Sequence, residues 1–256
     1  MIVLALALAG LAALTLFGGP VGALVAASVV VALASGELLR LARAGEVRPS
    51  SVVALVGAVM LLVVAYLRDE RAPRLFPAVI AAVIGLAFVE VLARRQRQEV
   101  VRSIGSAMLP VFVVGLFAAY MVSMRAMIDG FRLVLAVIAF VVAAQVGIVI
   151  ASRRSGQTQP LRAWQRYVAA QVGAFIAAVV IAITLPETFT WPTAIVLGAL
   201  IAVAAPSGAL ALRMLADDLG RTEPGTKRAP PRVVLALDGV LVAAPVAFYA
   251  FRVLAR

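Results

Sequence analysis

The chain has 256 residues, of which 64% are hydrophobic and 14% charged, and its mean hydropathy is +1.09. A soluble domain is roughly half apolar and about one-quarter charged, so this composition excludes an ordinary soluble enzyme. The net charge of +11 comes from basic residues that lie between long apolar runs, which indicates membrane-protein loops and no nucleic-acid partner. Because Cys and His are absent, any chemistry must use carboxylates, Lys, Arg or a bound metal ion.

Nine apolar runs have about the length of a membrane span, which needs roughly 20 residues. They are residues 2–17, 21–34, 51–67, 75–93, 104–123, 133–152, 167–185, 193–214 and 233–254. Gly18-Gly19-Pro20 is either a tight turn between two short helices or a break in one re-entrant element, which would leave eight spans. We predict an all-α, polytopic integral membrane helical bundle of about nine transmembrane helices, forming a single domain over residues 1–256.

The basic residues are distributed unevenly between alternate loops. The loops after the second, fourth, sixth and eighth runs hold 16 of the 23 Lys and Arg residues. Because positively charged loops stay on the cytoplasmic side, the amino terminus and the loops 153–166 and 213–232 are expected to be cytoplasmic. The expected location is a multi-pass protein of a bacterial-type inner (plasma) membrane.

The stretch 208–246 combines acidic and basic side chains between two apolar runs. It holds a third of the acidic residues of the protein, namely Asp217, Asp218, Glu223 and Asp238, and the basic residues Arg213, Arg221, Lys227, Arg228 and Arg232. Such a mixture is able to bind a phosphate group through Arg and Lys and Mg²⁺ through carboxylates. The alternative is a solvated loop with charge pairs along its helix ends.

Asp238 carries the most information in this stretch, because it lies inside the apolar run VVLALDGVLVAAP. An ionised carboxylate near the bilayer interior costs about 2.5–3.5 kcal/mol, so such a residue is a functional candidate. The alternative is a position close enough to the membrane surface to reach lipid headgroups or Arg232. Pro206-Ser207-Gly208 interrupts the preceding run, where a missing backbone donor permits a kink.

The stretch 208–246 resembles the carboxyl-terminal signature of the phosphatidate cytidylyltransferases (CDP-diacylglycerol synthases). The residues that match this signature are Gly208, Asp218, Gly220, Gly225, Asp238 and Pro245, with Glu223 in the place of an Asp. A second similarity lies in the loop QPLRAWQR, where Pro160, Arg162 and Trp164 match the family motif SPKKTWEG. By this resemblance, residues 151–256 form the family-like C-terminal part and residues 1–150 a divergent set of N-terminal helices.

The resemblance implies an enzyme that joins CTP to phosphatidate, forming CDP-diacylglycerol and pyrophosphate for phospholipid synthesis. It implies that Asp218, Glu223 and Asp238 are the catalytic residues and the ligands of Mg²⁺. It also implies that Arg162, Arg221, Lys227 and Arg228 bind substrate phosphates. The partners would be phosphatidate, CTP and membrane lipid. Pairing with a second copy, or with an active paralogue if the chain is an inactive member, is left open by the sequence.

Several positions depart from the family pattern. The family acidic residues near the end of the sixth run and in TWEG are replaced by Gln145 and Gln165, which keep hydrogen-bonding capacity but lose the charge that holds a divalent cation. Whether the protein is an enzyme is therefore open at this stage. The alternatives are a catalytically inactive family member that binds lipid or a partner, and an unrelated polytopic membrane carrier.

Overall fold

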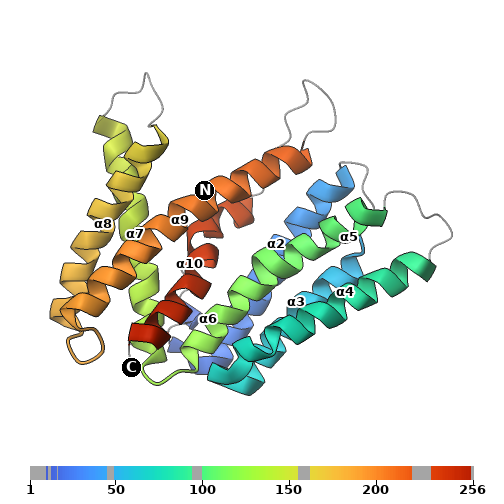
Figure 1. Ribbon diagram of the computed structural model, residues 1–256, viewed down its shortest axis with the longest axis horizontal. Helices are drawn as coiled ribbons and strands as arrows, with labels where there is room; N and C mark the ends of the chain where they lie inside the picture. Colours follow the sequence, from blue (N-terminus) through green and yellow to red (C-terminus); the bar gives the residue numbers. More distant parts are fainter. Residues whose placement is uncertain are drawn as a thin grey trace. The chain divides into compact units, whose positions relative to one another are not determined.

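The computed structural model describes residues 10, 13–15, 17–44, 49–93, 100–154, 162–220 and 232–254 (Figure 1). These residues form helices joined by short connections, and no strand occurs among them. The elements are α2 (Gly19–Ala44), α3 (Ser51–Arg68), η1 (Asp69–Arg74), α4 (Phe76–Ala93), α5 (Val100–Leu109), η2 (Pro110–Leu116), α6 (Phe117–Arg125), α7 (Gly130–Arg154), α8 (Ala163–Thr184), α9 (Trp191–Gly220) and α10 (Arg232–Leu254).

Seven helical segments within the described ranges are long and apolar enough to cross a membrane. They coincide with the second to the eighth predicted runs, and α5, η2 and α6 together make one of them, Val100–Arg125. The ninth run forms α10, whose segment Gly239–Leu254 is apolar but shorter. Most of the first run, residues 2–17, lies outside the described residues. The prediction of an all-α polytopic membrane protein is confirmed.

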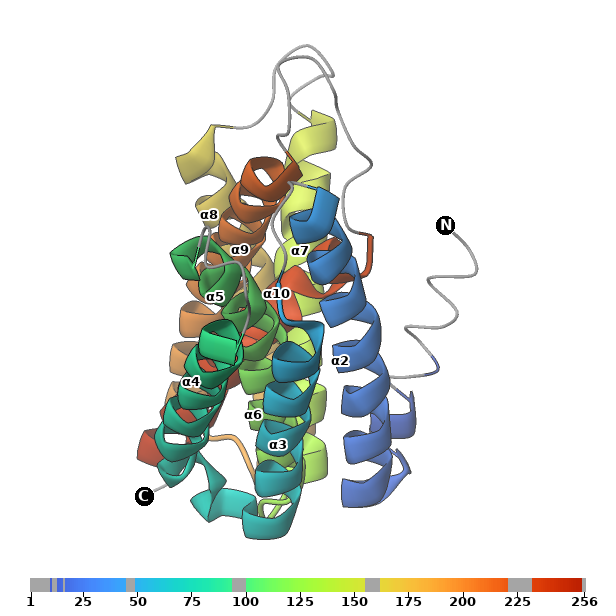
Figure 2. The ribbon, with the colours of Figure 1, turned by 90° about the vertical axis from the view of Figure 1, so that its right-hand side faces the viewer.

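Backbone contacts divide the chain into two compact units. The first contains Met1–Ile128 and Leu212–Ala236, and the second contains Asp129–Ala211 and Leu237–Arg256. Both α9 and α10 therefore begin in one unit and end in the other. Within the first unit, α2 and α3 lie side by side (Figure 2), and within the second, α7 and α8 do so (Figure 1).

A sharp backbone turn precedes α2. The amide of Gly18 donates to the Leu14 carbonyl over 2.9 Å, and Gly19 then adopts a φ of 63°. This left-handed conformation ends a helical turn and is open to glycine without steric cost. A side chain at Gly18 would also meet the Leu14 carbonyl oxygen at 2.6 Å. The described residues therefore form a sharp turn at Gly18-Gly19, which both predicted interpretations contain, and most of the run before it lies outside them.

Close approach at glycine holds the helices of the first unit together. A Cβ at Gly57 of α3 would lie 2.7 Å from Val83 Cγ1 of α4, and one at Gly115 of η2 would lie 2.8 Å from Ala58 Cα. The segment η2 is a π-helical turn that starts at Pro110, a residue that has no backbone donor. Apolar helices in lipid associate through such close packing, because the surrounding lipid is as apolar as their side chains.

The second unit has the tightest helix contact, between α7 and α8. A Cβ at Gly173 would lie 2.1 Å from the Ala143 carbonyl oxygen, and one at Gly147 would lie 2.3 Å from the Ala169 carbonyl oxygen. The two glycines thus allow the backbones of α7 and α8 to touch at two successive levels. Phe140, Phe189 and Phe248 of this unit are fully buried.

Candidate functional site

The predicted site residues are only partly described by the structure. Arg162 directly precedes α8 and is exposed, and Asp218 is exposed in the last turn of α9. The backbone of Asp238 belongs to α10, but its side chain is outside the described part. Glu223, Arg221, Lys227 and Arg228 lie outside the described residues altogether. The predicted meeting of Asp218, Glu223 and Asp238 therefore stays a prediction.

The side chains that the structure describes include no group of three or more carboxylates close enough together to hold a metal ion. Of the three predicted Mg²⁺ ligands, only the side chain of Asp218 belongs to that set. A Mg²⁺ ion takes one or two carboxylates together with phosphate oxygens of its substrate. Asp218 supplies a carboxylate of the right chemistry, and the side chains of Glu223 and Asp238 lie outside the described part.

The Asp238–Gly239 step of α10 lies in the second unit, against two other helices. Gly239 is buried, and a Cβ there would lie 3.1 Å from Val141 Cγ1, 3.2 Å from Gln145 Nε2 and 3.5 Å from Ala205 Cβ. Glycine thus allows α10 to approach α7 and α9 closely at this level. The half-buried amide of Gln145 is the polar group at the contact.

The proline of α9 is next to this contact, and α9 continues through it as one helix from Trp191 to Gly220. Pro206 lies within α9, where its missing N–H leaves one backbone carbonyl of the preceding turn without its usual donor. Ser207 Oγ donates to the Val203 carbonyl over 2.7 Å and is 3.1 Å from the Tyr167 hydroxyl of α8. Because Ser207 donates its only hydroxyl hydrogen to the Val203 carbonyl, the Tyr167 hydroxyl is the donor in the second bond. Polar groups of α7, α8 and α9 therefore occur within the apolar second unit, near the proline of α9.

Glu37 contacts the start of α10 in the first unit. Its Oε2 accepts hydrogen bonds from the backbone amides of Val233 at 2.9 Å and Val234 at 3.2 Å. The first amides of a helix have no partner within the helix, and a negative charge there also interacts favourably with the helix dipole. Glu37 thus caps the helix that carries Asp238. Sequence reasoning missed this role, because a capping residue from another helix leaves no local signal.

We expect Glu37→Ala to destabilise the first turn of α10 by about 1–2 kcal/mol, the usual cost of losing a helix cap. Hydrogen exchange measured by mass spectrometry on a peptide covering Val233 and Val234 would then be faster by about tenfold. Glu37→Gln retains an accepting oxygen and should give an intermediate rate. Equal exchange rates in all three proteins would contradict the capping role.

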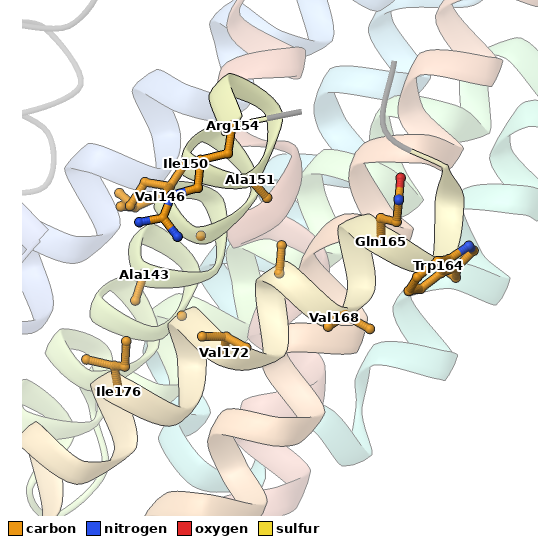
Figure 3. Close-up of a pocket in the computed structure, with 13 residues that line it drawn as sticks. Ala143, Val146, Ile150, Ala151, Arg154, Trp164, Gln165, Val168, Val172 and Ile176 are labelled. Atoms are coloured by element: carbon orange, nitrogen blue, oxygen red, sulfur yellow. The ribbon is translucent and has the colours of Figure 1, made fainter. Parts of the chain in front are cut away.

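A groove runs along the contact between α7 and α8 (Figure 3). Its volume is about 510 Å³, and most of its lining is apolar. Arg154 from the last turn of α7, together with Trp164 and Gln165 from the first turn of α8, lines one end. The side-chain oxygen of Gln165 accepts from the backbone amide of Arg162 over 2.8 Å and so caps α8. Trp164 and Gln165 thus belong both to the predicted motif loop and to the groove.

Comparison with known families identifies the chain. The profile of the cytidylyltransferase family matches residues 1–216, which include Arg162 and all of the groove residues and end before Asp218, Glu223 and Asp238. Comparison with curated protein sequences finds no match. The family match confirms the predicted resemblance, sets aside the alternative of an unrelated carrier, and supports a CTP-dependent transferase function in general. The chain belongs to the cytidylyltransferase family, the family of the phosphatidate cytidylyltransferases (CDP-diacylglycerol synthases).

Proposed function

We propose that the protein transfers the cytidylyl group of CTP to phosphatidate in the plane of a bacterial-type inner membrane. The products are CDP-diacylglycerol and pyrophosphate. Family membership over residues 1–216 supports a CTP-dependent transferase, and seven helices of spanning length suit an acceptor that is itself a membrane lipid. The loops 153–166 and 213–232 would face the cytoplasm, where CTP is available.

The observation that carries the proposal is the position of the Asp238–Gly239 step. An acidic residue in an apolar helix costs free energy and persists where it has a function. The backbone at this step packs against Gln145 of α7 and against Ala205, which directly precedes the proline inside α9. An acidic residue and a polar amide that come together between apolar helices are expected at a functional site.

The reaction is an in-line displacement at the α-phosphorus of CTP. A phosphate oxygen of phosphatidate forms the new bond to this phosphorus, and the bond to the oxygen that bridges the α- and β-phosphorus atoms breaks, so that pyrophosphate leaves with its electron pair. Arg162, Arg221, Lys227 and Arg228 would bind the phosphate oxygens and offset their negative charge. Their guanidinium and ammonium groups would also hold the donor and acceptor phosphates in line.

Mg²⁺ is the cation that this chemistry calls for, with Asp218, Glu223 and Asp238 as its proposed ligands. When bound, it would neutralise charge on the phosphates and on the leaving pyrophosphate. The three carboxylates would position it at the membrane surface.

A catalytically inactive member that binds lipid is the second candidate, and one observation favours it. Gln165 stands where the family motif has a Glu, and its side-chain oxygen is used to cap α8. An uncharged amide contributes no negative charge to a metal site, and the Gln165 oxygen is already engaged in capping. Under this hypothesis the fold is retained for binding, and turnover is absent.

A turnover assay separates the two candidates. The purified full-length protein is incubated in mixed micelles with phosphatidate, radiolabelled CTP and either Mg²⁺ or Mn²⁺. We expect labelled CDP-diacylglycerol to form, with release of one pyrophosphate per product. Folded protein that forms no product with either metal ion would overturn the proposed reaction and favour the inactive member.

A further inference from the structure

The groove between α7 and α8 opens on the outside of the helices. Its walls are apolar side chains that are roughly half exposed, among them Val146, Ile150, Val168, Val172 and Ile176. Its floor is formed where the backbones of α7 and α8 touch at Gly147 and Gly173. Close contact at glycine between helices that carry valine and isoleucine on either side necessarily leaves a furrow. In a spanning segment, exposed apolar side chains face lipid.

The length of the groove corresponds to one leaflet of a bilayer. On α8 its lining residues extend from Trp164 to Ile176, which is roughly 18 Å at a rise of 1.5 Å per residue. The hydrocarbon core of a bilayer is about 30 Å thick, so each leaflet contributes roughly 15 Å. A single acyl chain therefore matches the groove in length as well as in polarity.

One end of the groove is charged and the other is not. Arg154 is exposed at the end of α7 and Trp164 is exposed at the start of α8; in Figure 3 the two side chains lie on opposite sides of the groove, with the Arg154 guanidinium beside Val146. No carboxylate in the described part of the chain forms a salt bridge with Arg154. An arginine guanidinium binds a phosphate through two parallel hydrogen bonds, and tryptophan prefers the level of the lipid headgroups.

We propose that this groove binds one anionic phospholipid, with an acyl chain along the apolar furrow and the phosphate on Arg154. A second copy of the chain has a net charge of +11 and would add positive charge beside Arg154. The positive charge of this groove end therefore favours an anionic lipid over a second copy. The expected binding requires neither CTP nor a metal ion, and it is tested with a lipid other than phosphatidate, because Trp164 and Gln165 also belong to the motif loop of the proposed reaction.

The fluorescence of Trp164 reports on binding in the groove. The chain has only two Trp residues, and the other, Trp191, is outside the groove. The Trp191→Phe protein is placed in phosphatidylcholine vesicles. One set of vesicles contains brominated phosphatidylglycerol, and the other contains brominated phosphatidylcholine at the same mole fraction. Neither lipid is the proposed acceptor. We expect the brominated anionic lipid to quench Trp164 fluorescence with a relative binding constant about threefold to tenfold higher than that of brominated phosphatidylcholine.

Two matched pairs of variants test the site itself. Arg154→Gln should abolish the preference for the anionic lipid, whereas Arg153→Gln, at the neighbouring exposed arginine outside the groove, should retain it. Val172→Phe fills the groove and should reduce quenching, whereas Val180→Phe changes a similarly exposed residue of α8 outside it.

Equal quenching by the two lipids would overturn the proposal, as would equal effects of the two arginine substitutions. If Val172→Phe instead dissociates a dimer in analytical ultracentrifugation and leaves quenching unchanged, the occupant is a second copy and the lipid proposal is wrong. These outcomes do not depend on whether the protein forms CDP-diacylglycerol.

Discussion

The Asp238→Asn protein is expected to form CDP-diacylglycerol at least about 100-fold more slowly than the wild type. Changes to groups that only support a metal ligand already cost about 10–100-fold, and loss of a proposed ligand should cost no less. Asn has nearly the same size as Asp, but it lacks the negative charge that attracts a divalent cation. The rate is measured with saturating CTP and phosphatidate and with Mg²⁺ varied, so that weaker metal binding is separated from slower turnover.

Stability distinguishes a functional role of Asp238 from a structural one. The insertion cost of a charged residue is about 2.5–3.5 kcal/mol, and the uncharged amide of Asn lowers it, so the melting temperature of Asp238→Asn should be unchanged or higher. Asp69→Asn is the matched control, because Asp69 is exposed in η1 and has no part in the proposed site. Near-normal turnover by Asp238→Asn, or a loss as large in Asp69→Asn, would contradict the assignment of Asp238.

The second large effect is expected from Gly173→Ala, which should lower the melting temperature by about 5 °C. The added Cβ would lie 2.1 Å from the Ala143 carbonyl oxygen. Neither backbone is able to move away easily, because Gly147 and Ala169 make a similar contact one level along the same helices. Overpacking of this kind costs typically about 1–3 kcal/mol, and each kcal/mol corresponds to about 2–4 °C in a chain of this size.

Gly85→Ala is the control for helix propensity. A Cβ at Gly85 of α4 would meet nothing within 4 Å, and Ala favours a helix over Gly by about 1 kcal/mol, so this variant should be equally or more stable. Thermal unfolding of both variants is followed in detergent by size-exclusion chromatography with fluorescence detection. If Gly173→Ala melts no earlier than Gly85→Ala, the close contact of α7 and α8 is wrong.

The family match covers one of the two motif regions found in the sequence and ends before the acidic residues of the other. The similarities in residues 208–246 and in QPLRAWQR together predicted the family, and the profile match confirmed it. The first of them supplied Asp218, Glu223 and Asp238, and the matched range ends before all three. Their roles remain predictions, and the Asp238→Asn experiment is the direct test.

Glu37 shows the kind of residue that a linear pattern does not reveal. It lies 196 residues before Val233, whose backbone amide donates a hydrogen bond to it. Nothing near Glu37 in the sequence indicates a helix cap. Local caps are recognised because the capping side chain directly precedes its helix, as Ser50 does before α3. A cap supplied by another helix depends on how the helices pack.

The helical class, the membrane-spanning segments and the family follow from the sequence alone, because in lipid every backbone donor and acceptor must be satisfied within a segment. Length and hydropathy then suffice to locate each helix, as α7 and α8 show. The tertiary structure decided which helices touch and what their contacts leave open. Gly147 and Gly173 are unremarkable in a sequence with 19 glycines, yet they let two backbones meet and so create the groove that ends at Arg154. Contacts of this kind depend on the distance between helices, which no periodicity records.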